Sequence, residues 1–220
     1  NEIASKGFLK KDSMLGTALV DMYAKCGLVA KAQEVLEELP IRNVISWSTL
    51  IAGYTQKGQA IEALNCFEHV RKEGLSPDAV TYVCILQACG NASDIEKGKH
   101  IHEELMNNGL LEKVPVLGNA IVDMYAKCGV LAKAQEVLER LHVRSIVSWS
   151  ALIAGYAEQG QCQKALNCFE QMQSEGISPN VVTLVCILKA CGNIGSLLNG
   201  EQIHEKFVDR DMILQDIELG

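Results

Sequence analysis

Histidine, glutamate and cysteine are the side chains of this sequence with the chemistry for catalysis or metal binding. His102 and Glu104 have the H-x-E spacing with which nucleobase deaminases hold zinc and place a general acid/base, together with a P-C-x-x-C segment. The chain has no C-x-x-C, and it has no H-E-x-x-H, G-x-x-x-x-G-K or G-x-S-x-G motif. His102 also recurs as His204 in the same local context. The sequence therefore predicts a chain without catalytic residues, metal or cofactor.

The chain has nine cysteines, which could form disulfides or bind zinc. Cys162 stands alone, and the other eight recur in pairs at one displacement along the chain. An odd number of cysteines inside helical apolar patterns favours reduced thiols that pack as small hydrophobic side chains. We therefore expect reduced, buried thiols throughout. The recurring pairs are Cys26/Cys128, Cys66/Cys168, Cys84/Cys186 and Cys89/Cys191.

The elements that position these side chains follow from a repeat with a displacement of 102 residues. Residues 21–27 (DMYAKCG) return as residues 123–129, and residues 46–48 (SWS) return as residues 148–150. Self-similarity at a fixed displacement is the signature of a repeat architecture, and it determines the fold before any local motif does.

A finer period inside the long repeat predicts pairs of helices. Units of 31, 35 and 36 residues each contain a first helix, a short turn and a second helix. Gly27, Gly58, Gly129 and Gly160 close first helices, where the C-terminal cap needs positive φ. Since neither helix of a pair can bury its apolar face alone, neighbouring pairs must stack. Second helices are expected at 30–38, 60–73, 94–107, 132–140, 162–175 and 196–208.

Three recurring segments carry a resemblance to a known family. They read Trp-Ser-Thr/Ala-Leu-Ile-Ala-Gly-Tyr, then Ala-Leu-Asn-Cys-Phe-Glu, then Gly-Leu/Ile-Ser-Pro-Asp/Asn. Over residues 13–216 the chain resembles pentatricopeptide repeat proteins, and its unit lengths are similar to those of the PLS subclass of plant organelle RNA-editing factors. Tetratricopeptide repeats fit less well, because their period is a uniform 34 residues. The resemblance implies an all-α fold, a right-handed α-solenoid of stacked helical hairpins.

The resemblance also implies where each repeat begins. Residues 1–12 are expected to be the remnant of a preceding repeat, and residues 217–220 a tail. Between them lies a six-repeat array in the order S-P-L-S-P-L. Its repeats are 13–43 (S), 44–78 (P), 79–114 (L), 115–145 (S), 146–180 (P) and 181–216 (L).

Sequence-specific binding of single-stranded RNA, one base per repeat, is the function that the resemblance implies. An unstacked base offers its Watson–Crick edge to two or three side chains and its faces to others above and below. In the family, the fifth and the last residue of each repeat read the edge. Small polar side chains occupy these positions in the S and P repeats, as edge recognition requires. The pairs are Thr17/Asn43, Ser48/Asp78, Asn119/Ser145 and Ser150/Asn180.

Position 2 of each repeat supplies the apolar contact to a base face in the family. Here it is Ile45, Val80, Val116, Val147 or Val182, with Met14 less typical. The L-repeat pairs Val83/Val114 and Val185/Asp216 depart from the family pattern, and two valines cannot form hydrogen bonds. The family's code assigns G to Ser–Asp, A to Thr–Asn and Ser–Asn, and C to Asn–Ser. The resulting target is 5′-AGNCAN-3′, running parallel to the chain.

Most of these residues also have an ordinary structural interpretation. The hydroxyl residues could be first-turn helix residues, and Asp78 and Asn180 could be turn residues or N-caps after proline. The recurrence of small polar residues in every S and P unit favours the functional interpretation. Trp47 and Trp149 could stack on bases, but their fixed place in an apolar helix face favours core packing.

The net charge of −7 has the wrong sign for a protein that binds RNA through its phosphates. It favours the alternative function, a protein-interaction scaffold without direct RNA readout. Lys25 and Lys127 are candidate phosphate contacts, or else solvated residues that the helix dipole stabilises at helix ends. Acidic residues on second helices would not oppose RNA binding. The repeat frame places these there: Glu34, Glu37, Glu38, Glu62, Glu68, Glu136 and Glu139.

The resemblance sets further expectations about partners and location. The array would specify a site for an editing deaminase that lies elsewhere in the protein or on a partner, in the chloroplast or the mitochondrion. A further alternative that the family offers is that RNA binding requires a partner, an editing-complex protein. No apolar run approaches the ~18 residues of a membrane span. Asn1 is not an initiator methionine, so we expect a fragment or a processed chain.

Overall fold

The computed structural model describes residues 13–207, so the expected remnant at 1–12, the expected tail at 217–220 and Asp216 lie outside the described residues. Within residues 13–207 the chain is helical and has no strand. It forms two compact units, residues 1–117 and 118–220, and each is described by itself. None of the helices described is long and apolar enough to cross a lipid bilayer. The expected all-α class is confirmed.

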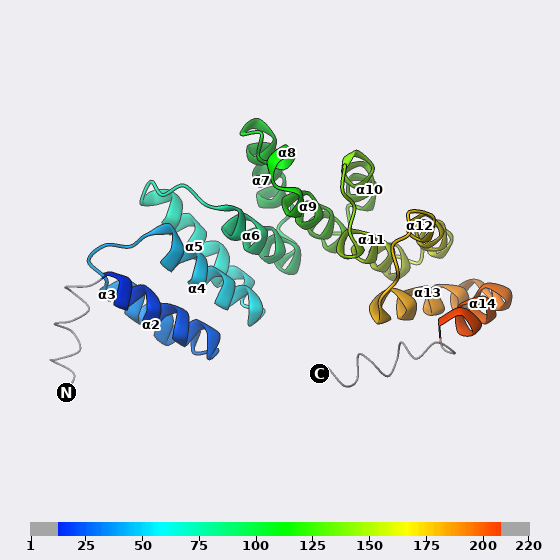
Figure 1. The fold of residues 1–220 in the computed structure, drawn as a ribbon, viewed down its shortest axis with the longest axis horizontal. Coiled ribbons are helices and arrows are strands. Elements are labelled where there is room, and N and C mark those ends of the chain that lie inside the picture. The colour runs from blue at the N-terminus through cyan, green and yellow to red at the C-terminus, as the bar shows by residue number, and fades with distance from the viewer. Residues whose placement is uncertain (1–12, 208–220) are drawn as a thin grey trace. The chain divides into compact units, whose positions relative to one another are not determined.

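Helical hairpins follow one another along the described chain (Figure 1). The first helices are α2 (Ser13–Lys25), α4 (Val44–Gln56), α6 (Ala79–Ala92), α9 (Pro115–Lys127), α11 (Ile146–Glu158) and α13 (Val181–Ile194). The second helices are α3 (Val29–Glu38), α5 (Ala60–Lys72), α7 (Ile95–Asn107), α10 (Leu131–Arg140), α12 (Cys162–Ser174) and α14 (Leu197–Phe207). One further short helix, α8 (Leu110–Lys113), follows α7 and was not expected.

The ends of these helices follow from local sequence. Asp94 caps α7 by accepting a hydrogen bond from the backbone N–H of Lys97 at 3.1 Å. Gly58 and Gly160 end the P-unit first helices with φ of 71° each, a value that glycine adopts without steric cost. The first helix α6 ends at Ser93 with φ of 55°, whereas its counterpart α13 ends at Gly195. The observed second helices differ from those expected by at most one residue at either end.

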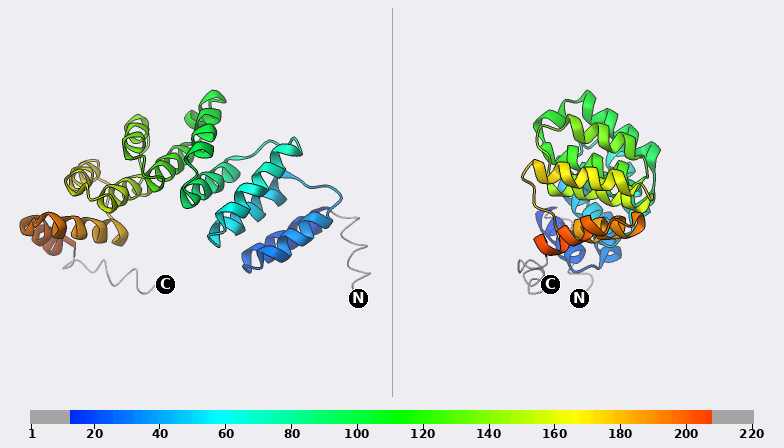
Figure 2. Two further views of the ribbon diagram at one scale, coloured as in Figure 1. Left: turned by 180° about the vertical axis from the view of Figure 1, so that it is seen from behind. Right: turned by 90° about the vertical axis from the view of Figure 1, so that its right-hand side faces the viewer.

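In unit 1 the hairpins stack in succession. The first helices α2, α4 and α6 pack side by side, α3 packs against α2 and α4, and α5 packs against α4 and α6 (Figures 1 and 2). Leu50, Ile51, Phe67 and Ile85 are fully buried between them. Burial of this kind is available only through stacking, as the repeat predicted.

Unit 2 shows the same hairpin packing. α11 and α12 pack against each other, both contact α13, and α10 lies against α11. Trp149, Leu152 and Ile153 are buried in this core. Each unit is therefore a stack of helical hairpins, which is the α-solenoid construction expected from the sequence.

A tryptophan network joins each S hairpin to the P hairpin that follows it. Trp47 is buried, and its Nε1–H donates to the Glu73 carboxylate at 2.9 Å. Arg42 donates to the other Glu73 oxygen at 2.7 Å and to the carbonyl of Leu36 at the end of α3. Burial works to raise the pKa of Glu73, but the hydrogen bonds from Trp47 and Arg42 outweigh it, and the pKa is lowered.

The same network recurs in unit 2 with Arg144, Trp149 and Glu175. Trp149 Nε1–H donates to Glu175 at 3.1 Å, and Arg144 pairs with the same carboxylate. Both tryptophans thus belong to the core, as expected, and neither is available to stack on a base.

The cysteines carry free thiols, and most of them are buried. Burial, and then the nearby Glu37 carboxylate, raises the pKa of Cys66 to about 12, and burial raises that of Cys168 to about 11. The expectation of burial is wrong for Cys26, which is exposed in the turn that follows α2. Cys128 and Cys186 are half-buried.

Candidate nucleic-acid interface

The residue expected from the sequence at the end of each S and P unit is the N-cap of the next first helix. Asn43, Asp78, Ser145 and Asn180 all have extended backbone, and the side-chain oxygen of each accepts a hydrogen bond from the backbone N–H three residues later. The sequence raised this possibility for Asp78 and Asn180 only. At Asn43 and Ser145 the local signal is a capping box, with serine three residues on.

The fifth residue of the first P unit contacts this cap through a buried threonine. Ser48 Oγ lies 2.5 Å from Thr81 Oγ1 and 3.5 Å from Asp78 Oδ1. Thr81 Oγ1 donates to Asp78 Oδ1 at 2.7 Å, and the Thr81 backbone N–H donates to the same oxygen at 2.8 Å. Ser48 is 6% exposed and Thr81 is fully buried, whereas Asp78 is exposed. The predicted pair Ser48/Asp78 therefore comes together, with Asp78 as its accessible member.

The second P unit repeats the arrangement with asparagine in place of aspartate. Ser150 Oγ lies 2.7 Å from Thr183 Oγ1, which donates to Asn180 Oδ1 at 2.8 Å. The Thr183 backbone N–H donates to the same oxygen at 2.9 Å. Thr183 is fully buried, and both Ser150 and Asn180 are half-buried.

Sequence reasoning missed Thr81 and Thr183 as parts of the site. Each is the third residue of an L unit and lies three residues after the cap that it contacts. The spacing Asp/Asn-x-x-Thr, which is an N-cap signal, could have identified them. Their contact with Ser48 and Ser150, however, joins residues 33 positions apart and depends on the stacking of hairpins.

For the pairs of the expected S units, the structure gives the burial of the fifth residue. Thr17 is half-buried on α2, and Asn119 is half-buried on α9. Asn119 Oδ1 is shielded from solvent and has no hydrogen-bond partner among the described residues. A shielded acceptor of this kind is costly unless something binds it.

Position 2 of the repeats leaves large apolar side chains exposed. Ile45, Val80, Val116, Val147 and Val182 are between 51% and 60% exposed, and Met14 is more exposed still. A well-packed monomer gains nothing from such exposure, so these residues are free to contact a ligand. In the L units, Val83 and Val114 are half-buried, Val185 is exposed, and its partner Asp216 lies outside the described residues.

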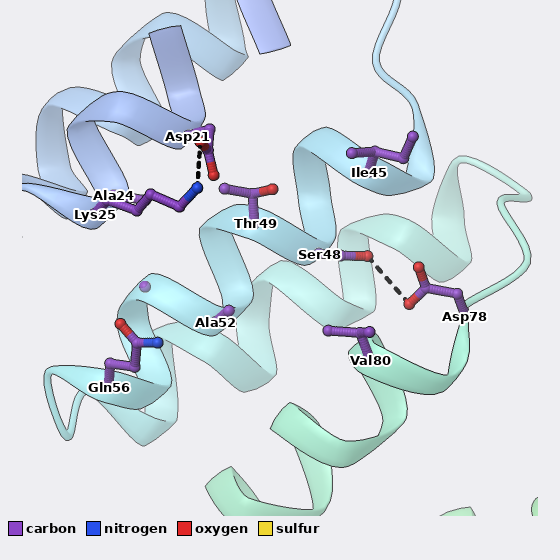
Figure 3. Close-up of a pocket in the computed structure, with 11 residues that line it drawn as sticks. Asp21, Ala24, Lys25, Ile45, Ser48, Thr49, Ala52, Gln56, Asp78 and Val80 are labelled. Atoms are coloured by element: carbon purple, nitrogen blue, oxygen red, sulfur yellow. Dashed lines mark hydrogen bonds and ion pairs between the residues drawn. The ribbon is translucent and has the colours of Figure 1, made fainter. Parts of the chain in front are cut away.

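Two of these apolar side chains and one predicted pair meet in a single pocket of about 280 Å³ in unit 1 (Figure 3). Ile45 and Val80 come from successive first helices, and Asp78 lies beside Ser48 between them. Lys25, paired with Asp21, lies at another part of the pocket wall. The pocket thus offers an apolar surface on two sides and a hydrogen-bonding edge between them.

Lys25 and Lys127 each form an ion pair one helical turn back, with Asp21 and Asp123, at 2.8 Å. Both are exposed and stand in the last turn of their helices, so the helix dipole also stabilises them. Only Lys25 of the two lines the pocket described above.

Charge is unevenly divided between first and second helices. The six described first helices carry as many acidic as basic side chains, and α4 and α6 carry neither. The glutamates expected on second helices lie on α3, α5 and α10. The described first helices thus carry no net charge as a set, although Asp21 and Asp78 line the pocket.

His102 is buried in α7, where Glu104 accepts a hydrogen bond from Tyr82 and pairs with Arg71. Among the described residues there is no group of histidine, cysteine, aspartate and glutamate side chains arranged to hold a metal ion.

Comparison with known proteins places the chain in a family. A model of the PPR repeat family matches residues 42–91 and 144–193, and a PPR repeat model matches residues 17–44, 80–110 and 119–146. The chain belongs to the pentatricopeptide repeat family. The chloroplastic pentatricopeptide repeat-containing protein CRR2 of Arabidopsis thaliana is 43% identical over 86% of this chain and 29% of its own length. A mitochondrial pentatricopeptide repeat-containing protein of the same plant is 36% identical over 92% of this chain and 36% of its own length.

This pentatricopeptide repeat chain therefore spans about a third of the length of the curated relatives it matches. Solved structures share its fold. The maize pentatricopeptide repeat protein PPR10 superposes with a TM-score of 0.67 at 22% identity, over 88% of this chain and 29% of that one. PPR10 in complex with an 18-nt psaJ RNA element gives 0.73 at 18% identity, over 92% of this chain and 31% of that one.

Proposed function

We propose that this chain binds single-stranded RNA sequence-specifically, with one base for each repeat. The observation that carries the proposal is the pocket in which Asp78, Ser48, Ile45 and Val80 meet. A base placed there would meet the exposed oxygen of Asp78 with its Watson–Crick edge. Its faces would contact the two apolar side chains from successive repeats.

The absence of net charge on the described first helices supports readout of bases over attraction to phosphates. Non-specific binding to nucleic acid is driven by Lys and Arg, which are few on these helices. The structure of PPR10 with a psaJ RNA element supports the same proposal, because it has the same hairpin fold.

We propose the S-P-L-S-P-L frame 13–43, 44–78, 79–114, 115–145, 146–180 and 181–216 for the repeats. Support comes from the first helices, which begin at residues 13, 44, 79, 115, 146 and 181. In this frame the edge-reading pairs are Thr17/Asn43, Ser48/Asp78, Asn119/Ser145 and Ser150/Asn180, and the target is 5′-AGNCAN-3′. The array would mark a site for organellar RNA editing or processing.

Related chloroplastic and mitochondrial proteins support an organellar location. A deaminase, where one acts, would lie outside residues 1–220 or on a partner of the editing complex. Lys25 and Lys127 would contribute weak phosphate contacts.

Fluorescence anisotropy with short labelled RNAs tests the proposal. An oligonucleotide containing AGNCAN should bind the full chain, and changing the G opposite Ser48/Asp78 to A should weaken binding by about tenfold. Changing either N should have little effect. Equal affinity for all single-base variants would discard base-specific readout.

The alternative function, a protein-interaction scaffold, is favoured by the net charge of −7. The same titration separates the two functions, because a folded scaffold protein would bind none of the RNAs.

A further inference from the structure

The N-caps that read the strand present only one of their two polar atoms outward. Asp78 Oδ1 is held by both the N–H and the hydroxyl of Thr81, and Asn180 Oδ1 is held in the same way by Thr183. Asp78 Oδ2 and Asn180 Nδ2 form no hydrogen bond within the described part of the chain. These two atoms are left for a ligand.

A backbone N–H can donate but cannot accept, so it discriminates between the two ends of an amide. The oxygen of Asn180 can face the Thr183 N–H, but its NH₂ group would place donor against donor there. The amide of Asn180 is therefore fixed with Nδ2 outward. A carboxylate has two equivalent acceptors, so Asp78 presents an acceptor whichever oxygen faces Thr81.

We propose that Thr183, the third residue of the second L repeat, is a positioning residue that fixes the hydrogen-bond polarity with which Asn180 reads its base. Thr81 anchors Asp78 in the same way, but the carboxylate of Asp78 needs no orienting donor. This inference rests on the proposed function, since it concerns the same RNA-reading pairs. The repeat therefore reads its base with a contribution from the next repeat in the chain.

The outward atoms match different purines. Adenine offers an acceptor at N1, which pairs with the Asn180 NH₂ donor. Guanine carries a donor at N1, which pairs with the Asp78 acceptor but opposes Asn180 Nδ2. At the preceding S unit, the backbone N–H of Ser46 holds Asn43 Oδ1 at 2.9 Å, so Asn43 also presents its NH₂ group. Discrimination at asparagine caps depends on this orientation, and discrimination at Asp78 does not.

Removing the N–H at two equivalent positions tests the inference. Thr183→Pro removes both donors that hold Asn180 Oδ1, and proline is tolerated in the first turn of a helix, best at its first position. We expect the ratio of affinities for A over G opposite Ser150/Asn180 to fall about five- to tenfold, because either end of the amide can then face the strand. Thr81→Pro should weaken binding but leave the preference for G over A opposite Ser48/Asp78 in place.

A matched double variant separates orientation from general damage. Asn180→Asp/Thr183→Pro should show the same G-over-A ratio as Asn180→Asp alone, since a carboxylate needs no orienting donor. An unchanged A-over-G ratio in Thr183→Pro, or an equal loss of discrimination in both proline variants, would overturn the inference. Failure of the unmodified chain to bind the parent RNA would instead reject the proposed function.

A second measurement needs no proline variant, in case these variants fail to fold. In protein labelled with ¹⁵N at asparagine and threonine, the side-chain NH₂ protons of Asn180 should give no strong nuclear Overhauser effect to the Thr183 amide proton. A strong effect would show the amide in the opposite orientation and would overturn the inference directly.

Discussion

At the scale of single residues, helix capping and the proposed base reading would use different atoms of the same side chain. Asp78 caps α6 with Oδ1 and lines the pocket of unit 1. The structural interpretation of such a residue is therefore compatible with a functional one. Helix capping needs a short side chain with an oxygen, and reading a base edge needs a second polar atom beside it.

Exchanging that second atom should exchange the base. Asp78→Asn replaces the outward acceptor with a donor, so the preference opposite Ser48 should change from G to A, by about 1–3 kcal/mol in relative binding free energy. Asn180→Asp is the matched reverse change in unit 2. Anisotropy titrations with RNAs that carry G or A opposite the varied pair measure this preference. An unchanged preference in both variants would remove these residues from the proposed reading edge.

The lowered pKa of Glu73 predicts a pH dependence of stability. A carboxyl whose pKa is lower in the folded state stabilises the fold above its ordinary pKa of about 4.3, and this stabilisation is lost as the pH falls through the folded value. Glu73→Gln should therefore destabilise the chain at pH 7 and have a smaller effect near pH 3. Urea unfolding at both pH values measures the change in the free energy of unfolding that the substitution causes. A pH-independent change would contradict the assigned network with Trp47 and Arg42.

At the scale of elements, close approach between successive first helices depends on a glycine. A Cβ built on Gly53 of α4 would lie 3.1 Å from both Ala24 Cβ and Val29 Cγ1. Contacts this short leave no space for a larger side chain unless the hairpins move apart.

Gly53→Val should accordingly destabilise unit 1 by about 1–3 kcal/mol through overpacking. Gly192→Val on α13 is the control, because a Cβ there meets nothing within 4 Å. Thermal unfolding followed by circular dichroism compares the two. Equal melting temperatures for both variants would mean that α2, α3 and α4 do not pack as closely as described.

At the scale of the whole molecule, most of the acidic charge lies outside the described first helices, although Asp21 and Asp78 line the pocket. The described first helices are electrically balanced, although the chain has a net charge of −7. In the proposed binding mode, the array would gain affinity from base contacts and release few counterions.

RNA binding should consequently depend weakly on salt. With two phosphate contacts, from Lys25 and Lys127, a plot of log K against log salt should have a slope of roughly −1.4. Lys25→Ala should make the slope shallower by about 0.7, whereas Lys99→Ala on the second helix α7 should leave it unchanged. A slope several times steeper would show that phosphate contacts dominate.

The sequence by itself determined the hairpins and their order, because the signals involved are local. Caps such as Asp94 act over three residues, glycines such as Gly58 end helices where they stand, and the 102-residue displacement exposes the repeat. The exposed valines and isoleucine at position 2 could also be predicted, since the family resemblance fixed their register.

Only the tertiary structure decided how the proposed reading edge is built. Ser48 contacts Thr81, and Ser150 contacts Thr183, across 33 residues of chain. These hydroxyl groups meet because successive first helices pack side by side, and no pattern within one helix encodes that approach. The orientation of the Asn180 amide, by contrast, follows from the backbone N–H of Thr183 three residues later, which is a local helix-cap interaction.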